Sequence, residues 1–486
     1  MSKTIFETSR VGRKGYTLSK NDVCLELSAI LPEKFTRKED AHMPEVSELD
    51  VMRHYLVLGQ KNHSVDKGFY PLGSCTMKYN PKVNEVAVRN SGLGNLHPYQ
   101  PESTVQGALE ILYELQEDLA EISGMANVTI QPVAGAQGEF VGLKMIAAYH
   151  KANGNTHKKT IIMPDSAHGT NPASCTLAGF NVVELKSNEF GKVDIDHLKD
   201  LVDENTAGFM LTNPNTLGLF EGRIEEIAEI IHSVDGLMYM DGANLNALLG
   251  IVQPGKIGFD VMHYNLHKTF STPHGGGGPG SGPVGVVDKL LPYLPVPMIS
   301  KDECGKYFLD YRNAETSIGK VHTFFGNFAV NVRAYVYIKM QGALGMRSIS
   351  ENAILNANYL QKKLEKYYNI EYKNTFCMHE FVADGTWQKE KYGINTLDIA
   401  KRMLDKGVHA PTVYFPLIIK EAMMIEPTET ESKETLDNFI DIMIEIAHEC
   451  ETDQDLMHHA PISTPVKRVD DVLAARKLDV RYTPES

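Results

Sequence analysis

Short apolar runs alternate with helical patterns through the middle of the chain, and this rhythm restricts the fold more than any other feature. The apolar runs lie at 128–133, 160–163, 181–185, 207–212, 237–241, 260–264 and 284–287. Helical patterns separate most of them and are clearest at 136–152 and 222–234. Strands that alternate with helices form βαβ units, so we expect an α/β fold with a mostly parallel sheet covered on both faces. Such sheets bind ligands beyond the carboxyl ends of their strands, so the candidate functional residues directly follow the apolar runs.

The rhythm also predicts how the chain divides. Residues 101–330 contain it and form a large domain. Residues 1–100 lack it and form an N-terminal extension with a loop-like stretch at 70–82. Helical patterns after 327, short strands near 380 and 412 and a helix at 433–449 predict a smaller C-terminal α+β domain over 331–450. A tail rich in charge and proline follows at 451–486.

The charge balance disfavours some classes of partner. The chain has 48 basic and 62 acidic residues and a formal net charge of −14. Nucleic acids and anionic membranes bind basic faces, so we expect neither as the main partner. The chain start has no apolar core and no uncharged apolar run is long enough to span a bilayer, so we expect a cytoplasmic protein without a secretory signal. The six cysteines form no CxxC or metal-knuckle pattern, which favours reduced thiols and no metal site.

Lys268 is the strongest candidate for catalysis. It follows an apolar run and precedes a glycine-rich loop in the segment YNLHKTFSTPHGGGGPGSGP at 264–283. Partial desolvation at a strand end favours the neutral amine, which is the form that makes a Schiff base. The alternative is an ordinary lysine beside a flexible loop. A phosphate-binding loop is disfavoured, because the GxxxxGK[ST] pattern is absent and the lysine precedes the glycines.

Asp241 ends the apolar run at 237–241. A carboxylate at this edge can pair with a pyridine nitrogen and keep it protonated, which makes the ring an electron sink. Ala243 is small enough for a flat ring to lie against the strand end. An aspartate before a helix is also a common N-cap. Together with Lys268, however, Asp241 indicates pyridoxal 5′-phosphate (PLP).

A PLP site also needs a cradle for the phosphate group. The turn VAGAQGEF at 133–140 lies between an apolar run and a helical pattern. Gly135, Ala136, Gln137 and Gly138 would present backbone N–H groups at a helix N-terminus, where an anion is favoured. A tight turn without a ligand would explain the same residues.

Polar residues also follow two further apolar runs. His168 follows the second apolar run and can stack on a cofactor ring and move a proton, or serve as a structural histidine. Asn213, Asn215 and Thr216 follow the fourth run, and one of them can hydrogen-bond to the ring hydroxyl. The sequence does not distinguish between these three, and turn geometry explains part of the motif.

Several long motifs lie in one order along almost the whole chain. The most specific are PLGSCTMKYNP (71–81), GAQGE (135–139), AHGTNPAS (167–174), TNPNTLGLFE (212–221), DGANLNALLG (241–250) and HKTFSTPHGGGGPGSGP (267–283). Together they resemble the decarboxylating glycine dehydrogenases, the P-proteins of the glycine cleavage system. The fused enzymes of this family are much longer, so a chain of 486 residues resembles the second subunit of the split, two-subunit form.

The resemblance implies a fold-type-I PLP enzyme with the aminotransferase-like architecture. Lys268 would form the Schiff base with PLP, Asp241 would pair with the pyridinium nitrogen and His168 would stack on the ring. Residues 135–137 would hold the phosphate. Further cofactor contacts are expected from Asn213, Thr216, Ala243 and His267, and an active-site loop at 71–78 is expected to bring Ser74, Cys75 and Thr76 to the substrate. Cys75 is interpreted as a packed residue, and a redox role would need a second thiol.

The implied reaction is the PLP-dependent decarboxylation of glycine, with transfer of the aminomethyl group to the lipoyl arm of the H-protein. The implied partners are the lipoylated H-protein and a homologous first subunit, in a heterotetramer of two chains of each kind. Three other interpretations are another fold-type-I decarboxylase or lyase, a non-catalytic scaffolding subunit, and a phosphate-binding module. A scaffold has no need of both Lys268 and Asp241, and the module explains only residues 135–138.

Overall fold

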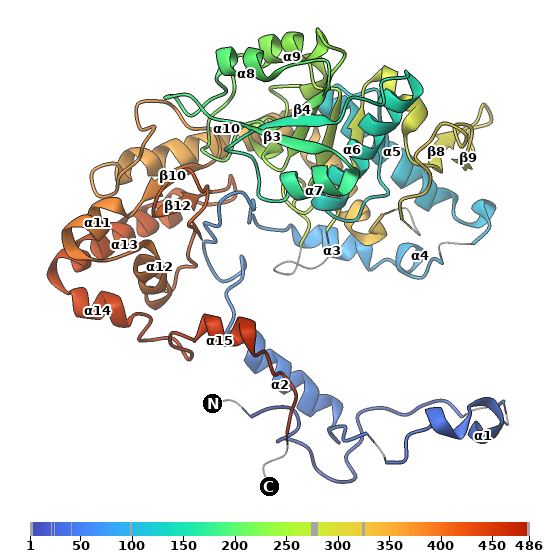
Figure 1. Cartoon of the computed structure of the whole chain (residues 1–486). Helices are drawn as coiled ribbons and strands as arrows, with labels where there is room; N and C mark the ends of the chain where they lie inside the picture. Colours follow the sequence, from blue (N-terminus) through green and yellow to red (C-terminus); the bar gives the residue numbers. More distant parts are fainter. Residues whose placement is uncertain are drawn as a thin grey trace. The chain divides into compact units, whose positions relative to one another are not determined.

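The computed structural model of the chain describes residues 3–20, 22–23, 25–39, 41–97, 100–273, 280–322 and 326–483 (Figure 1). Contacts within the chain gather in two compact units. One unit is residues 68–460, and the other combines the residues up to 67 with those from 461 onward. The four-part division expected from the sequence stays a prediction. The glycine run at 274–279 and Cys24 lie outside the described residues.

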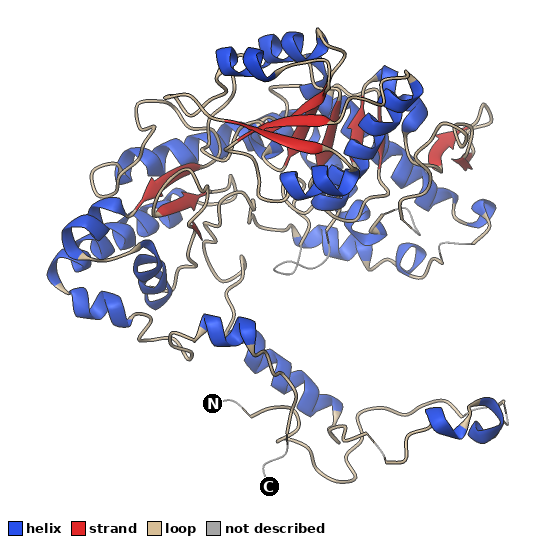
Figure 2. Cartoon of the chain, in the orientation of Figure 1, coloured by secondary structure: helices blue, strands red, loops and turns tan. Residues whose placement is uncertain are grey.

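The unit of residues 68–460 contains all the strands found among the described residues (Figure 2). The strands are β1 (Asn127–Thr129), β2 (Thr160–Pro164), β3 (Asn181–Leu185), β4 (Thr206–Thr212), β5 (Leu237–Gly242), β6 (Val261–Tyr264), β7 (Val284–Val286), β8 (Met298–Lys301), β9 (Tyr307–Asp310), β10 (Phe381–Asp384), β11 (Thr412–Val413) and β12 (Ala422–Ile425). The helices are α1 (Leu27–Ile30), α2 (Glu48–Gln60), α3 (Lys82–Val88), α4 (Ser91–Gly94), α5 (Gln106–Ser123), α6 (Gly135–Ala152), α7 (Asn171–Ala178), α8 (Ile195–Leu201), α9 (Ile224–His232), α10 (Phe328–Leu364), α11 (Thr386–Tyr392), α12 (Thr396–Asp405), α13 (Lys433–Thr452), α14 (Gln454–His459) and α15 (Asp471–Arg476). Among the described residues, none of these helices is apolar enough over a sufficient length to cross a membrane.

A seven-stranded sheet has the order β1-β7-β6-β5-β4-β2-β3. The five strands from β6 to β3 are parallel, and β7 runs antiparallel to both of its neighbours. Each of the seven apolar runs therefore contains a strand, and the mostly parallel sheet is confirmed. The strand expected over 128–133 is shorter and ends at Thr129. Pro132 has no backbone N–H to give to a sheet, so pairing does not extend through it.

The central strands β4, β5 and β6 of the large sheet are buried at every position, and most of their residues are apolar. In β5, Leu237 and Tyr239 join a core cluster with α6 and α7. Met238 and Met240 alternate with them and join a second cluster with α5, α9 and α10. Successive side chains of a strand point to opposite faces, so one apolar run holds helices against both sides.

A smaller antiparallel sheet of order β10-β12-β11 packs with α11, α12 and α13 around its own core. The sequence patterns predict β10 and β11 but miss β12 and the hairpin of β8 and β9. The long helix α10 contributes to the cores of both the large and the small sheet. It is kinked at Gly342, whose φ of 60° is outside the helical range. The helical patterns expected after 327 thus fall in α10.

Candidate active site

Parallel pairing aligns the ends of β4, β5 and β6 at one edge of the large sheet. In this register Thr212 lies beside Asp241, and Asp241 lies beside His263. Neighbours in register point to the same face, so His263 Nε2 lies 3.2 Å from Asp241 Oδ1. Asn171 Nδ2 donates to Asp241 Oδ2 at 3.0 Å, and the backbone N–H of Ala243 donates to Oδ1 at 2.9 Å. The aspartate is therefore buried and fixed in orientation.

The Asp241–His263 pair is held in its charged form. Burial by itself would raise the pKa of Asp241, but the charge of the adjacent His263 and the hydrogen bonds from His263 and Asn171 hold that pKa well below its ordinary value. Burial likewise opposes charge on His263, yet the adjacent carboxylate raises the pKa of that histidine. A fixed negative charge at a strand end is the group that a pyridinium nitrogen requires.

Lys268 lies in a connected cluster with three other residues. Its Nζ donates to the backbone carbonyl of Ser74 at 2.8 Å. Ser74 Oγ lies 2.9 Å from His168 Nε2, and His168 Nδ1 lies 3.9 Å from Asp241 Oδ2. Burial lowers the pKa of His168, so this imidazole is neutral at neutral pH. The structure thus brings the three predicted catalytic residues together and adds Ser74 between two of them.

The segment Ser74–Cys75–Thr76 reaches Lys268 through an unusual backbone. Ser74 and Thr76 have φ angles of 62° and 46°, in the left-handed region that residues other than glycine rarely adopt. Cys75 is half-buried between them, and burial raises the pKa of its thiol to about 11. This thiol is free, as are the other cysteines within the described residues. The predicted substrate loop therefore lies beside the predicted catalytic lysine.

The start of α6 is open where a phosphate cradle is predicted. Its N-cap residue is Ala134, and no side chain among the described residues caps the helix. The first N–H groups of an α-helix have no partner within the helix, so those of Gly135, Ala136 and Gln137 are available to an anion. The side chain of Gln137 is used inside the protein, because its amide bonds to two backbone groups. Gln137 can therefore offer only its backbone.

The hydrogen bonds in the turn after β4 distinguish the three residues that were expected to contact the ring hydroxyl. Asn215 accepts two N–H groups of its own turn and donates to a backbone carbonyl. Thr216 donates to a backbone carbonyl at 2.7 Å. Asn213 accepts a backbone N–H through Oδ1, while its buried Nδ2 has no hydrogen-bond partner among the described residues. Of the three, only Asn213 keeps a buried donor for a ligand.

Ala243 and His267 flank this cluster. Ala243 is buried directly after β5, where its backbone N–H holds Asp241. His267 precedes Lys268 and is half-buried, and its Nδ1 accepts the N–H of Ser281 at 3.3 Å. One ring nitrogen of His267 thus serves the protein itself.

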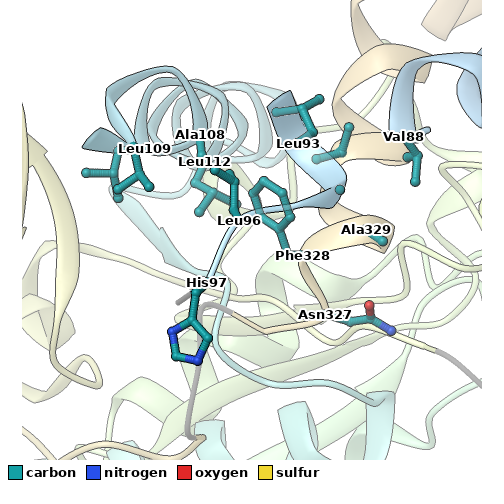
Figure 3. A pocket seen from close by; sticks show the side chains of 13 residues that line it. Val88, Leu93, Leu96, His97, Ala108, Leu109, Leu112, Asn327, Phe328 and Ala329 are labelled. Carbon is teal, nitrogen blue, oxygen red and sulfur yellow. The ribbon is translucent and has the colours of Figure 1, made fainter. Parts of the chain in front are cut away.

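A separate apolar cavity of about 270 Å³ lies beside α4, α5 and the start of α10 (Figure 3). Leu109, Leu112 and Phe328 form part of its wall, and His97 lies at its edge. None of the predicted site residues is among the described residues that line it. The cavity and the Lys268 cluster are therefore different sites.

Sequence reasoning missed two residues that hold the cluster. His263 lies inside an apolar run and was interpreted as part of a strand, although a polar residue in register with Asp241 is the signal that identifies it. Asn171 lies in the motif 167–174 and follows His168 at the start of α7. Neither role could be assigned without knowing which strands are neighbours.

Comparisons with known proteins agree with this architecture. The family model described as aminotransferase class-V matches residues 106–375, and the one described as glycine dehydrogenase, C-terminal domain, matches residues 349–465. Three relatives are each 57% identical over 479 residues, which cover 98% of this chain and 97% of the relative. All three are named probable glycine dehydrogenase (decarboxylating) subunit 2, and they come from Shouchella clausii, Halalkalibacterium halodurans and Bacillus cereus.

Solved structures share the fold at low sequence identity. One is a glycine decarboxylase (P-protein) of the glycine cleavage system in inhibitor-bound form, with a TM-score of 0.73 and 20% identity over 86% of this chain and 94% of that one. Another is a glutamate decarboxylase of Lactobacillus brevis, with a TM-score of 0.64 and 16% identity over 86% of this chain and 96% of that one. These likenesses confirm the fold-type-I, aminotransferase-like architecture expected from the sequence. Since the three relatives match over nearly their full length, the chain belongs to the family of glycine dehydrogenase (decarboxylating) subunit 2.

Proposed function

We propose that this chain is the PLP-carrying subunit of an enzyme that decarboxylates glycine and passes the aminomethyl group to the lipoyl arm of the H-protein. The observation that supports this most is the cluster of Lys268, Ser74, His168 and Asp241 at the carboxyl edge of the parallel strands. Membership of the family supports glycine as the substrate, because the relatives are named as decarboxylating glycine dehydrogenases.

The residues present fit PLP at each of its polar ends. Lys268 offers an amine to the aldehyde, and the Asp241 carboxylate faces the edge where a ring nitrogen would lie. The uncapped start of α6 suits the phosphate, and the buried Nδ2 of Asn213 suits the ring hydroxyl. When bound, PLP supplies the electron sink for the bond that breaks in the substrate.

The chain's own residues hold this site in order. Ser74 fixes Lys268 through its carbonyl and His168 through its hydroxyl. Asp241 keeps its negative charge because His263 pairs with it, so it can hold a proton on a ring nitrogen. The neutral imidazole of His168 lies between Ser74 and Asp241, where it can cover a ring and accept or return a proton.

We further propose two protein partners. The relatives are named as subunit 2, which supports a homologous first subunit, assembled with this chain as a heterotetramer of two chains of each kind. The lipoylated H-protein is the acceptor in the proposed reaction.

The proposed function is tested by the visible absorption of the purified chain with added PLP, alone and with the first subunit. We expect the wild type to show an absorption band of lysine-bound cofactor that changes with glycine, and borohydride reduction to fix PLP on the peptide that contains Lys268. In Lys268→Ala the reduced PLP should no longer be found on this peptide. The rate of glycine-dependent CO₂ release should fall by several orders of magnitude, since the variant lacks the nucleophile. Lys391→Ala, which removes an exposed lysine of α11, is the matched control.

Two results would contradict the proposal. The first is a Lys268→Ala variant that decarboxylates glycine at a near-normal rate. The second is release of CO₂ from other amino acids but not from glycine in the presence of lipoylated carrier, which would indicate a different fold-type-I decarboxylase.

A further inference from the structure

Two buried glutamates lie together at one end of the small sheet. The antiparallel register pairs Phe381 of β10 with Ile425 of β12, so Glu380 and Glu426, which flank this pair, are adjacent at one end of the two strands. Glu380 is 0% exposed and Glu426 is 1% exposed. Nothing in the proposed reaction uses either carboxyl group, although buried glutamates are rare and costly.

Both carboxyl groups are directed at the same three residues. Glu380 Oε2 accepts the N–H of Ser74 at 2.6 Å. Glu426 Oε2 accepts the N–H groups of Cys75 and Thr76 at 3.1 and 2.8 Å, and its Oε1 accepts the Thr76 hydroxyl at 2.6 Å. Successive N–H groups of a backbone that visits the left-handed region form a concave site for anions. Here the two side chains fill that site from within the protein.

The same three residues form the edge of the candidate active site. The backbone of Ser74 and that of Thr76 both lie in the left-handed region. Such a backbone persists only where its surroundings hold it. Ser74 makes all three of these contacts. Its N–H donates to Glu380, its carbonyl accepts a hydrogen bond from Lys268 Nζ, and its hydroxyl contacts His168. Glu380 is thus one residue away from both catalytic candidates, and Glu426 holds the next two residues of the loop.

We propose that Glu380 and Glu426 are positioning residues that hold residues 74–76 in their strained conformation, so that the Ser74 carbonyl and hydroxyl meet Lys268 and His168. The effect of this positioning on catalysis rests on the proposed function. The conformation of residues 74–76 does not depend on that function, because the glutamates hold it in the chain without any cofactor.

The pKa values of both carboxyl groups are raised, and this is compatible with the positioning role. Burial and the neighbouring carboxylate raise the pKa of Glu380 well above its ordinary value. Burial also raises the pKa of Glu426 to about 7, against the hydrogen bonds from Thr76 and the charge of Lys268. The adjacent His379 is buried, and burial lowers its pKa to about 3, so it brings no positive charge.

These three side chains also have the donor types of a metal site. All four carboxylate oxygens, however, already accept hydrogen bonds from Ser74, Cys75, Thr76 and Asn244. The oxygens are therefore committed to holding the loop, which favours a positioning role over metal binding.

The thiol of Cys75 provides a direct measure of the loop. We would measure its alkylation by iodoacetamide, resolved by peptide mass spectrometry, in the full chain without PLP. Cys75 is half-buried, and release of residues 74–76 would expose it. We expect Glu380→Ala and Glu426→Ala to raise its alkylation rate by about tenfold or more. Glu426→Gln should stay near the wild-type rate, because the amide oxygen still accepts both N–H groups and the Thr76 hydroxyl can accept from the amide.

Glu421→Ala is the matched control. Glu421 is a mostly buried glutamate directly before β12 of the same small sheet, but it binds Lys389 and Thr396 rather than the loop. We expect this variant to leave the alkylation rate of Cys75 unchanged, so that a general loosening around the small sheet is distinguished from release of the loop.

Three outcomes would overturn the proposal: unchanged alkylation in both alanine variants, Glu426→Gln reacting as fast as Glu426→Ala, or Glu421→Ala reacting as fast as either. In the assembled enzyme we expect Glu426→Ala to lower kcat for glycine and Glu426→Gln to restore it. If the alkylation results hold but the wild type does not decarboxylate glycine, the proposed function fails and the positioning role stands.

Discussion

At the residue scale, the buried pair of Asp241 and His263 determines what the site can bind. Its two members come from neighbouring strands and lie in register, 3.2 Å apart. We expect Asp241→Asn to raise the Kd for PLP by about tenfold or more and to slow CO₂ release. The ring nitrogen loses its charged partner, and His263 loses the carboxylate that pairs with it. Titration of the variant with PLP, followed by absorption, checks this expectation.

The matched control for that variant is Asp260→Asn. Asp260 is also buried and also paired with a histidine, His232, at 2.7 Å, but it lies at the amino end of β6. We expect this change to lower thermal stability without weakening PLP binding. Equal losses of affinity in the two variants would show that Asp241 acts through the fold and not on the cofactor.

Sequence patterns predict some residues of the cluster and not others, for a physical reason. Lys268 and His168 follow apolar runs and Asp241 ends one, and the sheet edge brings such positions together. Ser74 lies 194 residues before Lys268, so the expectation that its loop reaches the active site came from the family resemblance and not from a local pattern. The role of Glu380 was equally hidden, because it depends on the register of a strand that the patterns missed.

At the element scale, the central strands of the large sheet are predictable because both of their faces are buried and their sequences are mostly apolar. β12 has the short sequence AMMI after a turn, and its pairing with β10 is set by tertiary contacts rather than by its own pattern. The start of α6 is an intermediate case. Its helix was predicted, but the close approach of the chain at 280–283 was not.

That approach gives a prediction for the phosphate cradle. Gly282 donates its N–H to Pro132, and a Cβ at Gly282 would lie 2.0 Å from the carbonyl oxygen of Ala134. Gly282→Ala must therefore push the start of α6 away, and we expect the Kd for PLP to rise by about tenfold or more. Gly222→Ala is the control, because a Cβ there meets no atom within 4 Å among the described residues. Wild-type affinity in Gly282→Ala would place the phosphate elsewhere.

At the scale of the whole molecule, the unit formed by the residues up to 67 and those from 461 carries many large apolar side chains that are exposed. Its helix α2 contains no buried residue among those described. Leu49, Met52 and Leu56 are nevertheless spaced as one helical stripe, and they are 54%, 63% and 62% exposed. Large exposed apolar patches mark interaction sites, so this stripe is where a partner chain is expected to bind.

The double change Met52→Glu with Leu56→Glu tests that expectation against the proposed first subunit. Two charges in the centre of an apolar contact cannot be paired there, so we expect the mixed complex to weaken by about tenfold or more in size-exclusion chromatography with light scattering. Arg53→Glu introduces the same side chain at a polar position one step around the helix and should assemble normally. PLP binding by the variant chain alone should be unchanged, because no residue of the Lys268 cluster belongs to this unit. If the double variant assembles as the wild type does, the stripe is not the contact and the partner binds through the other unit.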